Sequence, residues 1–213
     1  MIAIIDYNAG NLRSIEKAFS IYERDVKVTN DPEIILSADK IVLPGVGNFG
    51  DSVKNIEAVK FDEKVCDKIN TNCSNLKELI TQDIGKVPFL GVCVGMQLLF
   101  EKSEESEGAG LGVFNGEVVK FTNVPKIPHM GWNNVKQIKD IPLFEGIKDN
   151  DYFYFVHSYY VKTFDEKIIA GTCDYGTKFT CAVNKDNIYA TQFHPEKSGK
   201  SGLKMIENFV ELI

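Results

Sequence analysis

The chain has 213 residues, of which 44% are hydrophobic and 25% are charged, proportions typical of a globular protein and sufficient for one domain with a sizeable core. Its formal net charge of −6 argues against a general nucleic-acid surface, which needs clustered Lys and Arg side chains. We therefore expect small molecules or proteins as partners, and residues 1–213 as a single domain.

The N-terminal residues Met1-Ile-Ala-Ile-Ile-Asp6 lack the basic region and cleavage site of a signal peptide, and they predict a first strand. No apolar run approaches membrane-spanning length, so we expect no membrane association. The five cysteines are odd in number and form no Cys-x-x-Cys pair. This pattern indicates neither a disulfide framework nor a metal site and favours a cytoplasmic location.

The first half of the chain alternates strand and helix patterns. Strands are predicted at residues 2–6, 26–29 and 40–43, followed by a buried strand that ends at Cys93. Helices are predicted at residues 11–22, from Asp31 and from Asp51; Asp31 suits an N-cap and Pro32 the first helical position. Such alternation predicts an α/β fold with a central, mostly parallel or mixed sheet flanked by helices.

The second half of the chain has a different sequence pattern, with an acidic loop at residues 101–107 and glycines at 108, 110 and 112. Strands of mixed direction are predicted at residues 117–122, 132–135, 152–161, 168–174, 179–184 and 188–193. Residues 201–213 place apolar side chains on one face of a helix, which we expect to cap the core. The polar residues 70–75 predict an exposed loop.

The segment Val87-Pro-Phe-Leu-Gly-Val-Cys-Val-Gly-Met-Gln97 predicts a buried strand that turns sharply into a helix at Cys93. Gly91 and Gly95 flank the cysteine at the spacing of a nucleophile elbow, where the strained backbone leaves no room for side chains. The amides and dipole of the following helix favour a thiolate at its start. The competing interpretation is a small buried hydrophobic residue, which is the commoner fate of a lone cysteine.

A second informative segment, Gln192-Phe-His-Pro-Glu-Lys197, follows an apolar strand pattern. If the extended backbone continues, His194 and Glu196 project together, because residues two apart share a face. A carboxylate beside an imidazole holds one tautomer and stabilises the protonated ring. With Cys93 these residues form the set needed for nucleophilic acyl transfer, whereas His194 alone would more often be a surface histidine at a strand end.

The segment Gly45-Val-Gly-Asn-Phe-Gly50 matches the G-x-G-x-x-G pattern of dinucleotide-binding loops. However, Pro44 precedes it, the strand before it is the third rather than the first, and no acidic residue ends the next strand at the expected distance. We therefore expect no dinucleotide cofactor. The loop instead offers amides of Val46 or Gly47 to a developing oxyanion, with the amide of Val94 as the other donor.

Taken together, the motifs around Cys93, residues 44–47 and His194 resemble those of the class I, triad-type glutamine amidotransferases over essentially the whole chain. Three further segments resemble those of the glutaminase subunits of imidazole glycerol phosphate synthases. They are Asp6-Tyr-Asn-Ala-Gly-Asn11, Pro128-His-Met-Gly-Trp-Asn133 and Tyr152-Phe-Tyr-Phe-Val-His-Ser-Tyr159. The resemblance implies a flavodoxin-like α/β domain.

The resemblance also implies a reaction, in which Cys93 attacks the side-chain amide of glutamine, His194 shuttles protons and Glu196 orients the imidazole. The glutamine would be held by Gly45, Gly47, Gln97, Glu105, Ser158 and Tyr159. Ammonia would pass to a partner (β/α)₈ cyclase subunit that makes imidazole glycerol phosphate and aminoimidazole carboxamide ribonucleotide in histidine biosynthesis. No cofactor is implied, and the loop of residues 45–47 is expected to act as a switch when the partner has bound its ribonucleotide.

By the same resemblance, the partner interface is expected at Asn11, Trp132, Tyr154 and Lys197. Three of these have ordinary alternatives, since Trp132 suits a core aromatic, Asn11 a helix N-cap and Tyr154 an apolar strand. His129 and His157 are expected to be hydrogen-bonded structural residues, and the four cysteines other than Cys93 to be non-catalytic.

Two departures from the family pattern stand out. Residues 51–86 are longer than usual, which predicts an added loop or helix, and Val94 replaces the commoner leucine without removing the amide. Two other functions stay open at this point. One is a paralogous glutaminase subunit that supplies ammonia for surface-sugar modification. The other is a stand-alone γ-glutamyl cysteine hydrolase, which would be active without a partner.

Overall fold

The computed structural model describes residues 1–213 and contains a sheet of 12 strands. Its parallel part runs in the order β2 (Val26–Thr29), β1 (Ile2–Ile5), β3 (Lys40–Leu43), β4 (Phe89–Val92) and β12 (Ile188–Thr191). This is the flavodoxin-like strand order, in which sites form at the carboxyl ends of the strands. Strands β1, β4 and β12 are buried at every residue, as expected for strands covered on both faces.

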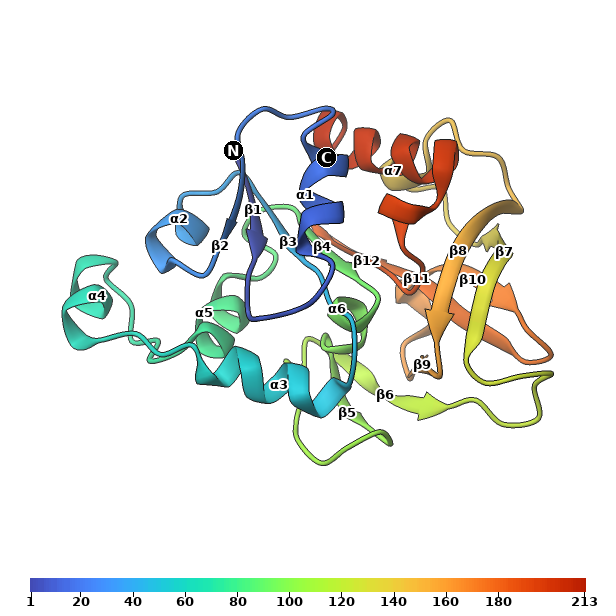
Figure 1. Cartoon of the computed structure of the whole chain (residues 1–213), viewed down its shortest axis with the longest axis horizontal. Coiled ribbons are helices and arrows are strands. Elements are labelled where there is room, and N and C mark those ends of the chain that lie inside the picture. The colour runs from blue at the N-terminus through green and yellow to red at the C-terminus, as the bar shows by residue number, and fades with distance from the viewer.

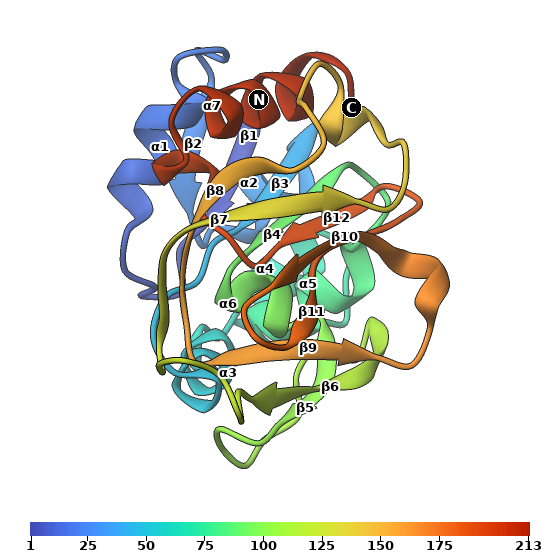
Figure 2. The same cartoon turned by 90° about the vertical axis from the view of Figure 1, so that its right-hand side faces the viewer.

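Helices cover both faces of this parallel part (Figure 2). On one side lie α1 (Leu12–Phe19) and α7 (Gly199–Glu211), where Phe19 meets Phe209 edge to face with ring centroids 6.1 Å apart. On the other side lie α3 (Phe49–Ala58) and α5 (Leu76–Asp83), while α2 (Pro32–Leu36) follows β2. Asp31 caps α2 by accepting a hydrogen bond from the amide of Glu33, which confirms the predicted helix start.

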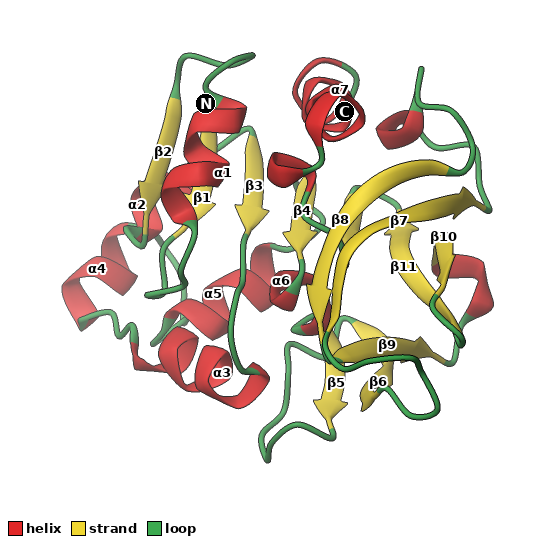
Figure 3. Ribbon diagram, turned by 45° about the vertical axis from the view of Figure 1, so that its right-hand side comes forward, coloured by secondary structure: helices red, strands yellow, loops and turns green.

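The second half adds strands that pair mostly in antiparallel fashion. They are β5 (Phe100–Ser103), β6 (Phe114–Lys120), β7 (His129–Gln137), β8 (Asp151–His157), β9 (Tyr159–Thr163), β10 (Ile169–Asp174) and β11 (Lys178–Lys185). Strand β11 joins them to the parallel part through β12, and β7 and β8 form a long curved ribbon (Figure 3). The chain also contains three short 3-10 helices, η1 (Pro142–Phe144), η2 (Glu166–Ile168) and η3 (Pro195–Lys197). One cluster of 56 buried hydrophobic residues forms the core.

Several predicted boundaries are wrong. Residues 152–161 form two strands, because the chain changes partners at Ser158: β8 pairs with β7, whereas β9 pairs with β6 and β11. The acidic segment 101–107 begins inside β5, where Glu101 and Lys102 are exposed and Phe100 is buried. Charged side chains are common on such short, exposed strands. The first helix is shorter than predicted, and the C-terminal helix starts and ends two residues earlier.

The segment 51–86 contains the short helix α4 (Glu63–Lys68), which projects from the body of the molecule (Figure 1). Residues 70–75 form a loop as predicted, but the loop is not fully exposed. Cys73 is completely buried, and the buried Asn75 caps α5 by accepting from the amide of Glu78. Polarity along the sequence did not reveal this capping role, since Asn is frequent both in loops and at N-caps.

Candidate active site

Cys93 lies at the sharp turn between β4 and α6 (Val94–Gln97), with φ 56° and ψ −108°. Only a tightly packed turn keeps a residue other than glycine in such a conformation. A Cβ atom added to Gly95 would lie 1.9 Å from the carbonyl oxygen of Leu43, and one on Gly91 would lie 2.9 Å from the carbonyl oxygen of Gly95. The structure therefore confirms the elbow and the steric reason for its two glycines.

The imidazole of His194 and the carboxylate of Glu196 are in contact, with Nδ1 2.8 Å from Oε1 and both side chains buried. The prediction that a continued extended strand places these two side chains together is wrong. Strand β12 ends at Thr191, and Glu196 lies in the 3-10 helix η3 rather than in a continued strand. A tight turn after His194, with Pro195 at its first position, brings the carboxylate back onto the ring.

Glu196 has a second donor that the sequence did not predict. The side chain of Asn11 donates from Nδ2 to the same Oε1 at 2.6 Å. Asn11 precedes α1 in the left-handed conformation, with φ 69°, and makes no side-chain cap bond. The N-cap role is therefore replaced by a contact with the carboxylate, and Asn11 is half-buried.

The position of the imidazole is fixed through the backbone as well. The amide of His194 donates to the carbonyl of Tyr154 at 3.0 Å, and the hydroxyl of Ser198 donates to the carbonyl of His194 at 2.6 Å. The same hydroxyl accepts from the amide of Tyr154 at 2.9 Å. The turn is thus held against β8, and it leaves His194 Nε2 buried and without a hydrogen-bond partner.

Electrostatics make His194 basic. Burial opposes the charged form, but the nearby sulfur of Cys93 and the hydrogen bond and charge of Glu196 outweigh it and raise the pKa of His194 to about 10. A protonated imidazole beside the sulfur is the arrangement expected for a cysteine nucleophile. By contrast, burial raises the pKa of Cys173 to about 12, as expected for a structural thiol.

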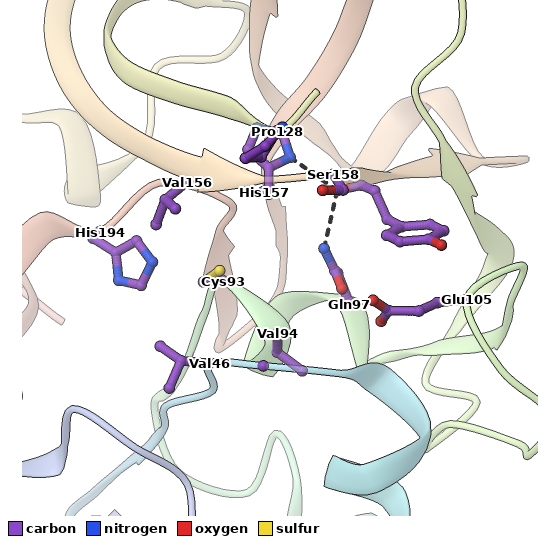
Figure 4. A pocket seen from close by; sticks show the side chains of 12 residues that line it. Val46, Cys93, Val94, Gln97, Glu105, Pro128, Val156, His157, Ser158 and His194 are labelled. Atoms are coloured by element: carbon purple, nitrogen blue, oxygen red, sulfur yellow. Dashed lines mark hydrogen bonds between the residues drawn. The ribbon is translucent and has the colours of Figure 1, made fainter. Parts of the chain in front are cut away.

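A cavity of about 280 Å³ opens at the elbow (Figure 4). It is lined by Val46, Gly47, Cys93, Val94, Gln97, Glu105, Pro128, Val156, His157, Ser158, Tyr159 and His194. Nine of these twelve were predicted as site residues from the sequence; the other three are Pro128, Val156 and His157. Of the predicted catalytic and glutamine-binding residues, only Gly45 and Glu196 are not in the lining, and Glu196 contacts His194 instead.

Two polar side chains of the cavity are already held in place. Gln97 donates from Nε2 to the carbonyl of Tyr159 and to Oε1 of Gln192, both at 3.1 Å. Glu105 accepts from the amide of Phe49, at the start of α3, at 2.7 Å. The remaining oxygens of these two side chains are acceptors suited to an ammonium or amide group.

The glycine loop lies directly over the elbow. A Cβ atom on Gly45 would clash with the backbone of Gly95, whereas one on Gly47, at φ 104°, would meet nothing within 4 Å. The amide of Val94 donates to the carbonyl of Gly45 at 3.3 Å. The predicted oxyanion donor is therefore occupied in this conformation, and the carbonyl of Gly45 must turn away before Val94 can bind an oxyanion.

A pair of buried histidines lies at the wall of the cavity, which His157 lines. His157 Nδ1 donates to the carbonyl of Tyr159 at 2.8 Å, so its Nε2 accepts from Nδ1 of His129 at 2.9 Å. Nε2 of His129 then accepts from Asn133 at 3.3 Å. Burial lowers the pKa of His157 to about 3 and that of His129 to about 4. Both rings are thus neutral and hydrogen-bonded, in line with the structural role predicted for them.

The predicted interface residues lie beside the triad turn. Trp132 is 55% exposed, which excludes the core alternative, and it meets Tyr154 edge to face across β7 and β8 with centroids 6.2 Å apart. Met130 and Tyr152 on the same two strands are also exposed. Lys197 is exposed next to Glu196 in η3. An exposed apolar cluster of this kind is typical of a protein interface.

Neither a metal centre nor a membrane segment is found. No group of three or more His, Cys, Asp or Glu side chains is placed to hold a metal ion. The longest helix, α7, has 13 residues, and no helix combines the length and apolar character needed to cross a membrane.

Comparison with known proteins gives consistent results. The model of the glutamine amidotransferase class-I family matches residues 3–212. The chain is 65% identical to imidazole glycerol phosphate synthase subunit HisH 1 of Methanococcus maripaludis and 57% identical to subunit HisH of Methanocaldococcus jannaschii, over 100% of both chains in each case. Among bacteria, subunit HisH of Aromatoleum aromaticum is 43% identical, over 98% of this chain and 97% of that one.

Solved structures agree in fold. A glutamine amidotransferase superposes with a TM-score of 0.69 at 15% identity, covering 100% of this chain and 98% of that one. The glutaminase domain of Trypanosoma brucei CTPS gives a TM-score of 0.63 at 17% identity, covering 98% of this chain and 91% of that one. At such identities the likeness concerns the fold alone.

Proposed function

The chain belongs to the class I glutamine amidotransferase family, and from that membership we propose that it is the glutaminase subunit of an imidazole glycerol phosphate synthase, acting in histidine biosynthesis. Its likeness to curated subunits along the full length supports this function over the surface-sugar alternative. The observation that carries the chemistry is the strained elbow at Cys93 with the hydrogen-bonded His194–Glu196 pair beside the same cavity.

In the proposed reaction, the sulfur of Cys93 attacks the side-chain carbonyl carbon of glutamine. The imidazolium of His194 gives its proton to the leaving nitrogen, so that ammonia departs and a glutamyl thioester remains. Neutral His194 then takes a proton from water, which attacks the thioester and releases glutamate. Glu196 keeps the ring in one tautomer and stabilises its charge, as the third member of a triad does.

The negative oxygen of each tetrahedral intermediate needs donors, and the loop of residues 45–47 controls them. In this conformation the carbonyl of Gly45 accepts from the amide of Val94. Rotating the peptide between Gly45 and Val46 would release that amide and turn the N–H of Val46 toward the oxyanion. The open surroundings of Gly47 leave room for this rotation. We propose that the partner protein drives it, so that glutamine is hydrolysed only when ammonia can be used.

The partner we propose is a (β/α)₈ cyclase subunit, docked on the exposed cluster around Trp132 and Tyr154 and next to Asn11 and Lys197. Shielded transfer has a chemical reason, because ammonia released into neutral water becomes mostly ammonium and loses its nucleophilic lone pair. The cyclase would use the ammonia to make imidazole glycerol phosphate and aminoimidazole carboxamide ribonucleotide.

The test is glutamate release by the purified chain, alone and with the barrel partner and its ribonucleotide ligand. We expect slow release alone, a large increase in the complex, and no release by Cys93→Ala. Cys66→Ala is the matched control, since Cys66 is a half-buried free cysteine outside the site. Full activity of the isolated chain would support the stand-alone hydrolase instead, and residual turnover by Cys93→Ala would remove Cys93 from the mechanism.

A further inference from the structure

The side chain of Gln192 is fully buried and does not line the cavity. Its Nε2 donates to the sulfur of Cys93 at 3.6 Å, and its Oε1 accepts from Nε2 of Gln97 at 3.1 Å. Both ends of this amide are therefore used, one by the nucleophile and one by a residue of the cavity wall. Burying an amide is costly unless it is hydrogen-bonded, so these two contacts fix its place.

A chain of contacts sets which end of the amide faces the sulfur. The carbonyl of Tyr159 only accepts, so the group of Gln97 that faces it is the NH₂. That same NH₂ meets Gln192, which must present its oxygen there and its own NH₂ to Cys93. The ring of His157 also donates to the carbonyl of Tyr159, at 2.8 Å, and so anchors the start of the chain (Figure 4).

We propose that Gln192 is a positioning residue for the nucleophile, whose amide N–H holds the sulfur of Cys93 in its reactive rotamer and stabilises its thiolate. The inference rests on the proposed function and adds a residue to it. The strained backbone at Cys93 fixes the direction of its Cα–Cβ bond but leaves the staggered positions of the sulfur open. A donor at one of these positions selects it, and a hydrogen bond to the charged form favours that form.

Gln192 and Gln97 should therefore affect different kinetic constants. Gln192 contacts the nucleophile from outside the cavity lining, so its loss should lower kcat and leave the KM for glutamine within about twofold. Gln97 lines the cavity, so its loss should raise KM as well. If the amide of Gln192 were purely structural, its loss would lower the thermal stability without separating the effects on kcat and KM.

The experiment compares Gln192→Met and Gln192→Glu with the matched control Gln137→Met. Gln137 is half-buried at the end of β7 and donates to the carbonyl of Ile147, away from the site. Two rates are measured: glutaminase turnover of the complex with the barrel partner and its nucleotide, and alkylation of Cys93 in the isolated chain by iodoacetamide, followed by mass spectrometry of its peptide. Thermal melts report whether each variant is folded.

In Gln192→Met we expect kcat and the alkylation rate at pH 7 to fall roughly 10- to 100-fold, the effect of losing one hydrogen bond to a charged group. Gln192→Glu keeps an acceptor for Gln97, but it removes the donor and adds negative charge beside the sulfur. Its alkylation should be slower still. Gln137→Met should match the unmodified chain in both rates.

Wild-type alkylation rates in folded Gln192→Glu would overturn the proposal, as would an equal loss in Gln137→Met. The alkylation comparison uses no glutamine and no partner. If the unmodified complex lacks glutaminase activity, the proposed function fails while the role of Gln192 is still decided by the alkylation rates.

Discussion

All three histidines of the chain are buried, yet they occupy two sites with opposite electrostatics. Around His129 and His157 the partners are neutral, and burial lowers the pKa of both rings. At His194 burial acts in the same direction, but a carboxylate and the nucleophile reverse the result. Burial alone therefore makes a histidine a neutral hydrogen-bonding residue, whereas an anionic neighbour makes it able to carry a proton.

The largest effect should come from His194. Replacing it with Asn in the complex should lower kcat/KM for glutamine by about 10⁴-fold, because the proton donor and the charge partner of the nucleophile are lost together. Glu196→Gln should cost about 10³-fold, since the ring stays but loses its orienting charge. Steady-state glutamate release checks both. A loss below tenfold in His194→Asn would contradict the assignment of His194 as the proton carrier.

The histidine pair should control acid stability rather than activity. The folded pKa of His157, about 3, lies below its ordinary value of 6.5, so the unfolded chain binds more protons between these values. The pair therefore supports the folded state above pH 6.5, and this support is lost as the pH falls toward 3. His157 alone should account for roughly 3 kcal/mol of lost unfolding free energy at pH 4.

His157→Phe tests this in a pocket already lined by Phe121, Phe155 and Phe179. At pH 7 the variant should be less stable by about 1–3 kcal/mol, because the carbonyl of Tyr159 loses a donor. Measured by urea unfolding, the free energy of unfolding of the variant should change less between pH 7 and pH 4 than that of the unmodified chain. Parallel pH profiles for the two proteins would show that His157 carries no such linkage.

The opposite sign applies to His194, whose folded pKa of about 10 lies above 6.5. Its contribution to stability is complete below pH 6.5 and is lost as the pH rises toward 10. Urea unfolding of His194→Asn should therefore show a weaker loss of stability between pH 7 and pH 10 than the unmodified chain. If the free energy of unfolding changed with pH between 7 and 10 to the same extent in both proteins, His194 would not be protonated in the folded chain.

The smallest effect should come from Asn11. Asn11→Ala removes one donor to Glu196 and leaves the donation from His194 in place, so glutamate release should fall only about fivefold. Asn8→Ala is the matched control, because Asn8 also has a left-handed backbone, at φ 63°, but is exposed. Equal effects of the two variants on turnover would assign the loss to the backbone rather than to Glu196.

Much of the fold and of the site was predictable because the signals are local. The buried strand before Cys93, the glycines on either side of it and the alternation of strands and helices all lie within short windows of the sequence. Most of the cavity lining was also predicted, since nine of its twelve residues were expected as site residues from the sequence. The predicted strand boundaries were wrong where the chain changes its pairing strands, as at Ser158. They were also wrong where the chain turns without a hydrophobic pattern to mark the turn, as after His194.

The sequence by itself determined which chemical groups are present and where the elbow forms, because strain, periodicity and capping depend on near neighbours in the chain. Only the tertiary structure decided how these groups meet. Asn11 reaches Glu196 across 185 residues of chain, and Gln192 reaches Cys93 across 99. Such contacts depend on strand order and on how loops pack at the carboxyl edge of the sheet, which no short window of sequence contains.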